Sequence, residues 1–256
     1  MPTVKTAILI PARFASTRLP AKALLRETGK YLIEHVYEQA SQTTCASDVI
    51  VATDDERILR AVASFGGRVV LTATNHQSGT DRIAEVAQSL DSDILINVQG
   101  DEPTIDPKAI DLLDSLMRTH PEAEMATLAV PFDRQENWQS PNMVKVVTDA
   151  WGRAIYFSRS PIPYCRDGTP DFSSGKYLQH LGIYAYRRES LLKLASLPPH
   201  PLEDIEKLEQ LRAIAQGWAI QVGVVAHAGR GIDTPEDYAL FVNSYRQQIL
   251  QSRRAA

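Results

Sequence analysis

Residues 6–22 read TAILIPARFASTRLPAK, an apolar stretch followed at once by a cationic loop. The unbroken apolar run at 6–10 is typical of a strand that is buried on both faces. The loop behind it carries three cations, Arg13, Arg18 and Lys22, among small and turn-forming residues. In open α/β sheets, ligands bind where loops leave the carboxyl ends of strands, and cations at that place bind phosphates. The segment therefore predicts a polyphosphate site, with a merely solvated basic loop as the alternative.

Strand and helix patterns alternate from this segment through the first half of the chain. Short β-branched runs predict strands, and apolar residues at helical spacing predict helices. The predicted strands cover residues 6–10, 49–52, 68–72 and 93–98, and the predicted helices cover 31–41, 56–65, 81–90 and 107–120. Such alternation indicates an α/β fold in which helices cover both faces of a parallel sheet.

The pattern changes after residue 125. Strands are predicted at 126–131, 143–148 and 154–157 without helices between them, which favours a mixed or antiparallel extension of the sheet. Further strands are predicted at 182–187 and 219–225, helices at 189–195, 203–216 and 235–250, and a loop at 167–176. Thr234 is the candidate N-cap of the last helix. We expect a single domain, 1–256, with a core at about 1–125 and 218–256 and a lobe at about 126–217.

Composition limits the classes of function. The chain has 256 residues, 44% of them hydrophobic, and a net charge of −4. This acidic balance disfavours binding to nucleic acid or to an anionic membrane surface. Cys45 and Cys165 match no zinc or redox spacing, and no stretch has the length of a membrane span. We expect a cytoplasmic protein that does not insert into membranes.

Two further segments carry carboxylates where the backbone is free to turn. Asp101 follows a predicted buried strand in NVQGDEP (97–103), where Gly100 would let the chain turn toward the cationic loop. Magnesium prefers one or two carboxylates together with substrate phosphates, so Asp101 is a candidate metal ligand. Asp233, in GRGIDTPED (229–237), is a second one. The alternatives are an acidic turn at Asp101 and support of a helix N-terminus by Asp233.

The remaining polar strand ends have two possible roles. ATDD (52–55) and SGTDR (78–82) are polar strand ends, and SGTDR combines groups suited to a base or ribose. Asp54 or Asp55 and Ser78 or Thr80 could instead be helix caps. Arg159 and His180 taken singly would be a salt-bridge partner and a core or surface histidine.

Nine segments in chain order resemble the 3-deoxy-manno-octulosonate (Kdo) cytidylyltransferases, or CMP-Kdo synthetases, of the sugar nucleotidyltransferase superfamily. The resemblance runs from about residue 8 to 241, and nine segments in the right order are specific although each alone is weak. The segments are IPARFASTRLPAKAL (10–24), ATDDERI (52–58), SGTDRI (78–83), NVQGDEP (97–103), PNMVKVV (141–147), YFSRSPIP (156–163), HLGIYAYRRESL (180–191), LEQLR (208–212) and GIDTPED (231–237).

This resemblance implies a Rossmann-like nucleotidyltransferase fold, with a mostly parallel twisted sheet and a β-rich insertion for sugar binding and dimerisation. It implies a homodimer that uses Mg²⁺ to convert CTP and Kdo into CMP-Kdo and diphosphate, which activates Kdo for lipopolysaccharide synthesis. Alternatives are a cytidylyltransferase for 8-amino-Kdo or sialic acid, a uridylyl- or guanylyltransferase, and a non-catalytic nucleotide-binding regulator. The presence of Asp101 and Lys22 disfavours the regulator.

The resemblance also assigns residues. The implied catalytic residues are Arg13, Arg18, Lys22, Asp101 and Asp233, of which Asp101 and Asp233 are the implied metal ligands. The implied nucleotide-binding residues are Pro11, Ala12, Arg13, Arg18, Lys22, Thr53, Asp54, Ser78, Gly79, Arg82 and Asp101. The implied sugar-binding residues are Gln99, Arg159, His180, Tyr184 and Glu209. The chain departs from the family at Ala21 and Ala23, where Gly and Pro are more usual, so the conformation of this loop is in question.

Overall fold

The computed structural model describes residues 4–16, 18–229 and 231–255, and the side chains up to residue 251. Thr17 and Arg230, which belong to two of the quoted segments, lie outside the described residues. The chain divides into two compact units. The first unit comprises Ala7–Leu90, Asn97–Pro107 and Gly229–Ala256, and the second comprises Met1–Thr6, Asp91–Ile96 and Lys108–Ala228.

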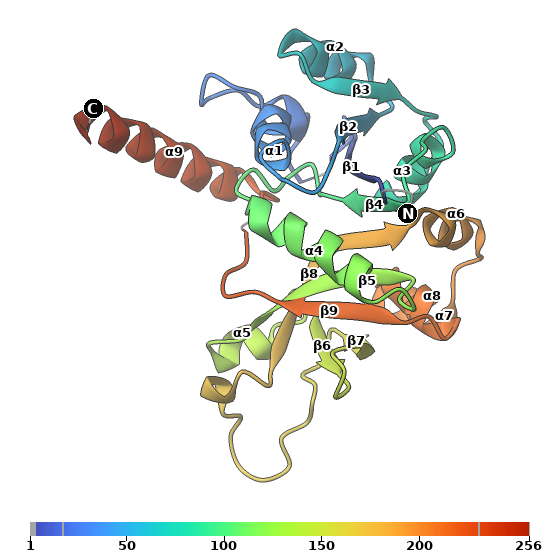
Figure 1. The fold of residues 1–256 in the computed structure, drawn as a ribbon. Coiled ribbons are helices and arrows are strands. Elements are labelled where there is room, and N and C mark those ends of the chain that lie inside the picture. The colour runs from blue at the N-terminus through green and yellow to red at the C-terminus, as the bar shows by residue number, and fades with distance from the viewer. Residues whose placement is uncertain (1–3, 17, 230, 256) are drawn as a thin grey trace. The chain divides into compact units, whose positions relative to one another are not determined.

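The first unit is built on parallel strands, as the alternating pattern predicts. β1 (Thr6–Ala12) pairs with β2 (Asp48–Thr53), which pairs with β3 (Arg68–Leu71). Its helices are α1 (Leu32–Ala40), α2 (Glu56–Ser64), α3 (Gly79–Ala87), α9 (Pro235–Ala255) and the 3₁₀ turn η1 (Lys22–Leu24) (Figure 1). Residues 7–10 of β1 are fully buried, which explains their unbroken apolar sequence.

Strand register brings three of the predicted segments to one edge of this unit. Pro11 lies opposite Ala52, and Ala12 lies opposite Thr53, so the loop after β1 and the segment after β2 leave the sheet together. The N–H of Val98 donates to the carbonyl of Leu9 at 3.0 Å, which sets the NVQGDEP segment beside β1. The carboxyl ends of the strands therefore meet at one place, as parallel pairing requires.

The second unit contains the mixed sheet expected after residue 125. Its strands are β5 (Met125–Pro131), β6 (Lys145–Thr148), β7 (Ala154–Ser158), β8 (Leu178–Arg187), β9 (Ile220–Val224) and most of β4 (Ile94–Asn97). β5 is parallel to β9 and antiparallel to β8, and β6 is antiparallel to both β7 and β8. Helices α4 (Pro107–Thr119), α6 (Arg188–Ser196) and three shorter α-helices belong to the same unit. The α/β class with a mostly parallel sheet is confirmed.

Two predictions for the second unit are wrong. The short helix α5 (Gln135–Gln139) lies between β5 and β6, where no helix was expected, and buries Trp138. The helix predicted at 203–216 is two helices, α7 (Pro201–Glu206) and α8 (Gln210–Ala215). They are separated because Lys207 adopts a left-handed backbone (φ 53°), a conformation that ends an α-helix.

The two compact units do not have the borders of the predicted core and lobe. The second unit takes in α4 and residues 91–96, which the prediction placed in the core. The predicted core and lobe differ in expected function, whereas the two compact units are defined by contacts. The predicted borders therefore stay a prediction.

Candidate functional site

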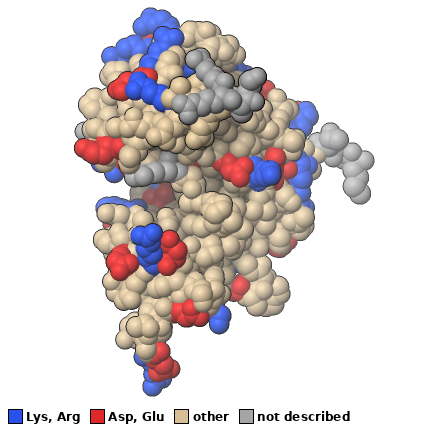
Figure 2. All heavy atoms as spheres, turned by 90° about the vertical axis from the view of Figure 1, so that its left-hand side faces the viewer, with Lys and Arg blue, Asp and Glu red and all other residues tan. Residues whose placement is uncertain are grey.

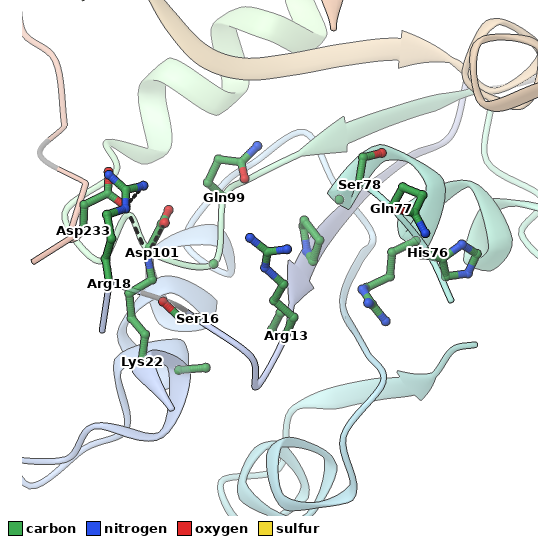
Figure 3. A pocket seen from close by; sticks show the side chains of 16 residues that line it. Arg13, Ser16, Arg18, Lys22, His76, Gln77, Ser78, Gln99, Asp101 and Asp233 are labelled. Atoms are coloured by element: carbon green, nitrogen blue, oxygen red, sulfur yellow. Dashed lines mark hydrogen bonds and ion pairs between the residues drawn. The ribbon is translucent and has the colours of Figure 1, made fainter. Parts of the chain in front are cut away.

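A pocket of about 300 Å³ lies in the first unit at the edge where these segments meet (Figure 3). The loop after β1, residues 76–82, residues 99–101 and Asp233 form its lining. It brings together most of the residues assigned to the nucleotide and the metal. Those that line it are Pro11, Ala12, Arg13, Arg18, Lys22, Ser78, Gly79, Arg82, Asp101 and Asp233, together with Gln99.

Gly100 allows the close approach that shapes this pocket. A Cβ atom at this position would lie 2.7 Å from the carbonyl oxygen of Pro11, closer than a real contact permits. Because Gly100 has no side chain, the chain can cross the end of β1 and turn at Asp101. The turn expected from the sequence at Gly100 has this physical cause.

Lys22 joins the two candidate metal ligands. Its Nζ donates to Asp101 Oδ2 at 2.6 Å and to the carbonyl oxygen of Ile232 at 2.7 Å, and it lies 3.4 Å from Asp233 Oδ1. Arg18 donates to the same Asp233 oxygen at 3.0 Å (Figure 3). The lysine side chain is only 15% exposed, whereas Arg18 is 67% exposed. Two carboxylates from distant segments thus converge on one ammonium group.

The loop that carries Lys22 is held by its own core. Leu19 packs in a buried cluster with Leu32 of α1 and with Ile232, Tyr238 and Val242 from the end of the chain. Ala21 precedes η1 and adopts the left-handed conformation, φ 55° and ψ 28°. A glycine is the usual residue for that conformation, so Ala21 departs from the residue type that this backbone favours.

The N-terminus of α9 positions Asp233. The hydroxyl of Thr234 accepts from the N–H of Asp237 at 3.1 Å, so the prediction of Thr234 as N-cap is confirmed. The carboxylate of Asp237 accepts in return from the N–H groups of Thr234 and Asp233, at 3.1 and 3.3 Å. The Asp233 carboxylate is therefore not needed as a helix cap and is directed to Arg18 and Lys22.

The donor set at Asp101 and Asp233 fits a magnesium ion that also binds phosphates. Carboxylate oxygens are the protein ligands that Mg²⁺ prefers, and it often takes only one or two of them. The described residues contain no cluster of three or more His, Cys, Asp or Glu that could hold a metal ion. A metal at this pair would therefore depend on oxygens from a substrate.

Several side chains in the segments assigned to the nucleoside hydrogen-bond to other parts of the protein or cap helices. The Arg82 guanidinium is buried and donates to Asp54 at 2.8 Å and to Thr72 at 2.6 Å. Asp55, not Asp54, caps α2, and Ser78 caps α3. The alternative role as a helix cap therefore applies to Asp55 and Ser78. Thr53 is fully buried, and neither Thr53 nor Asp54 lines the pocket.

Three polar residues of the pocket were not singled out from the sequence. They are Ser16, His76 and Gln77 (Figure 3). The His76 ring makes a short contact with Glu85. Ser16 lies within the quoted segment 10–24, and His76 and Gln77 directly precede the segment 78–83. These positions were the only signal, because a loop of this composition has no periodicity.

Three of the residues assigned to the sugar gather in the second unit. His180 and Tyr184 lie on β8 with ring centroids 5.4 Å apart, and burial lowers the pKa of His180 to about 3. Burial raises the pKa of Tyr184, and the charge of nearby Glu209 raises it further. The imidazole is therefore neutral and lies 3.0 Å from the hydroxyl of Thr127.

Arg159 is occupied by the backbone of the same unit. Its guanidinium donates to the carbonyl oxygens of Glu206, Pro141 and Lys207 at 2.7, 2.9 and 3.4 Å. Gln99, the fifth residue assigned to the sugar, lines the pocket of the first unit.

Surface charge and helix length bear on the expectation that the protein binds neither nucleic acid nor membrane. On the face drawn in Figure 2, basic and acidic side chains lie in small mixed groups, not in a continuous basic stripe. Every helix in the described part of the chain is too short or too polar to cross a bilayer.

Comparison with known proteins identifies the family. Residues 7–221 match the family model described as Cytidylyltransferase. Proteins named 3-deoxy-manno-octulosonate cytidylyltransferase are similar to this chain: that of Rhodopirellula baltica is 50% identical over 96% of this chain and 100% of its own length, and that of Geobacter sulfurreducens is 49% identical over 90% and 94%.

Solved structures agree with the sequence matches. A CMP:2-keto-3-deoxy-manno-octonic acid synthetase complexed with CTP superposes with a TM-score of 0.90 at 44% identity, covering 95% of this chain and 99% of that one. A cytidylyltransferase from Leptospira borgpetersenii, 19% identical with a TM-score of 0.63 over 98% and 96%, shares the fold. The chain thus belongs to the cytidylyltransferase family and, within it, to the 3-deoxy-manno-octulosonate cytidylyltransferases.

Proposed function

We propose that this protein transfers CMP from CTP to Kdo and releases diphosphate. The observation that carries the proposal is the pocket in which Arg13, Arg18 and Lys22 meet Asp101 and Asp233. Cations and a carboxylate pair in one pocket suit a nucleoside triphosphate with its metal. The names of the relatives supply the identity of the base and of the sugar acid.

The cationic loop would bind the part of CTP that leaves. Arg13, Arg18 and Lys22 would neutralise the β- and γ-phosphates, and the exposed Arg18 side chain has freedom to reach them. Diphosphate is a better leaving group when its charge is neutralised, so these cations would lower the barrier as well as bind.

The reaction needs positioning and charge neutralisation rather than a covalent nucleophile. The anomeric hydroxyl oxygen of Kdo would form a bond to the α-phosphorus of CTP and release its proton to solvent. The bond from that phosphorus to the bridging oxygen would break, and diphosphate would leave in line with the attack. No protein nucleophile is required.

Asp101 and Asp233 would hold a magnesium ion in this reaction. When bound, the ion would supply charge neutralisation at the phosphates. Lys22, whose ammonium now contacts both carboxylates, would then turn toward the phosphates.

The sugar acid would be held by Gln99, Arg159, His180, Tyr184 and Glu209. His180 is neutral, and one ring nitrogen contacts Thr127, so its other nitrogen would serve a sugar hydroxyl. A homodimer, a cytoplasmic location and a role in supplying lipopolysaccharide synthesis belong to the same proposal.

A substrate panel tests the proposal. Diphosphate release is measured with each of the common nucleoside triphosphates against Kdo, 8-amino-Kdo and sialic acid. We expect CTP with Kdo to give the highest kcat/KM, by about 10-fold or more. A higher value with another sugar acid or another triphosphate would reassign the substrate.

Two variants test the pocket itself. Lys22→Met and Asp101→Asn should each lower kcat by about 100-fold or more, because each removes a charge at the reacting phosphates. Circular dichroism should show an unchanged fold. Lys30→Met is the matched control, since Lys30 pairs with Glu38 in the same unit and does not line the pocket. Near-normal turnover of Lys22→Met would remove Lys22 from the mechanism.

A further inference from the structure

Lys145 is a fully buried lysine whose partners are all backbone carbonyls. It begins β6, and its Nζ donates to the carbonyl oxygens of Ser140, Met143 and Arg159 at 2.9, 2.9 and 2.5 Å. An ammonium group has three N–H donors, and here each of them has one acceptor. A buried charge costs stability unless it is hydrogen-bonded in this way. Lys145 therefore ties two residues of the preceding loop, 140–143, to the end of β7.

Arg159 holds the same loop from its other side. Its Nη1 donates to the carbonyl of Pro141, while Nε and Nη2 donate to the carbonyls of Glu206 and Lys207. The latter two carbonyls lie at the end of α7, where the left-handed Lys207 stops the helix. Terminal carbonyls of a helix need partners from outside it, and Arg159 supplies them.

Glu206 completes this set of contacts. Its two carboxylate oxygens accept from the hydroxyl of Ser158 at 2.6 Å and from the N–H of Arg159 at 3.0 Å. The loop 140–143, the end of β7 and the end of α7 are thus joined in a closed ring of hydrogen bonds. We call this ring the Lys145–Arg159–Glu206 network.

The network supports two residues assigned to the sugar acid. Arg159 is a member of it, and Glu209 follows the turn that Arg159 closes, two residues after Lys207. The network is also attached to β8, since His180 donates its N–H to the carbonyl of Val144 at 2.8 Å.

We infer that Lys145 and Glu206 are positioning residues for the sugar acid: they fix the backbone of Arg159, from which its side chain extends, and the turn that leads into Glu209. The inference rests on the proposed function. Misplacement of a binding group by about 1 Å costs up to about 100-fold in rate, so the network would control sugar binding without touching the sugar.

The test compares Glu206→Gln and Lys145→Met with the wild type. Glu206→Gln keeps the shape of the side chain and removes one of its two acceptors, and Lys145→Met removes all three donors. We expect the KM for the sugar acid to rise by about 10-fold or more in both, while the dissociation constant for CTP, measured without sugar, stays within about twofold.

Arg187→Met is the matched control. The Arg187 guanidinium also donates to three backbone carbonyls of the second unit, those of Ala123, Met117 and His120 at 3.2, 2.7 and 3.1 Å. Its loss should lower the melting temperature and leave the KM for the sugar acid unchanged. This contrast separates positioning from stability, because a purely structural role would affect all three variants alike.

The outcomes are distinct. A wild type that releases no diphosphate with any sugar acid would overturn the proposed function and this inference with it. An active wild type whose variants keep the KM for the sugar acid within about twofold would overturn the inference alone. If Lys145→Met does not fold, Glu206→Gln and Ser158→Ala decide the question, because each removes only part of the network.

Discussion

Ala21 shows how a single residue can conflict with the backbone that surrounds it. It is one of two non-glycine residues with positive φ among those described, the other being Lys207. The left-handed conformation costs an L-residue about 1–2 kcal/mol. Glycine has no such steric cost but loses more conformational entropy on folding. The loop that carries Lys22 therefore contains local strain.

We expect Ala21→Gly to be neutral or to raise the free energy of unfolding by up to about 1 kcal/mol, because relief of strain outweighs the entropy of glycine. Ala23→Gly is the matched control. Ala23 is buried within η1, and glycine there should lower the free energy of unfolding by about 1 kcal/mol. Urea unfolding measures both, and an Ala21→Gly protein as unstable as Ala23→Gly would contradict the argument.

Glu102 links stability to pH. Burial, with the nearby charge of Asp101, raises the pKa of this carboxyl from 4.5 to about 7. The folded protein therefore keeps a proton that the unfolded chain releases at lower pH. The contribution of protonated Glu102 to the free energy of unfolding is complete below pH 4.5 and is lost as the pH rises through about 7.

Glu102→Gln should remove this dependence, because an amide does not titrate. We expect the variant to gain about 1–3 kcal/mol in free energy of unfolding relative to the wild type between about pH 5 and about pH 8. The control is Glu56→Gln, whose side chain is 73% exposed and should show no such change. A parallel pH profile for wild type and Glu102→Gln would show that Glu102 ionises normally.

At the scale of elements, caps and strand ends decide where functional groups point. α9 begins at the reciprocal bonds between Thr234 and Asp237, and the same bonds hold the backbone of Asp233. Parallel pairing of β1 with β2 brings their carboxyl ends to one edge. The site is therefore placed by the ends of regular elements, not by their interiors.

Thr234→Ala should lower the free energy of unfolding by about 1 kcal/mol, the usual cost of a lost N-cap. It should also raise the KM for CTP, because Asp233 loses the support of the cap. Thr234→Ser keeps the hydroxyl and is the control that should preserve both values. Thermal unfolding and diphosphate release measure the two effects, and wild-type behaviour of Thr234→Ala would show that α9 does not need this cap.

At the scale of the whole molecule, the proposed reaction depends on a metal, and we expect that folding does not. No protein-only cluster of three or more metal-binding side chains occurs in the described ranges, and the candidate carboxylates are neutralised by Lys22 and Arg18. Activity and folding should therefore respond differently to a chelator.

We expect EDTA to lower the rate of diphosphate release by about 100-fold or more and added Mg²⁺ to restore it. The circular dichroism spectrum and the melting temperature of the substrate-free protein should not change. Turnover that persists in EDTA would contradict the assignment of Asp101 and Asp233. A chelator that unfolds the protein would contradict the account of the fold.

Much of this protein could be predicted from its sequence. The alternation of elements predicted the parallel strands of the first unit, because the periods of 2 and 3.6 residues are local properties. Arg13, Lys22 and Asp101 were predicted to share a pocket, because loops that follow parallel strands meet at one edge.

Only the tertiary structure decided which partner each polar side chain takes. Lys22 lies 211 positions from Asp233, and Arg159 lies 47 positions from Glu206, so no local pattern could pair them. The break between α7 and α8 has the same origin, because contacts with Arg159 support a turn that helical periodicity does not reveal. The sequence by itself determined most of the elements and the chemical groups of the site, whereas packing determined the direction of each group, because hydrogen-bond partners are selected by distance in space.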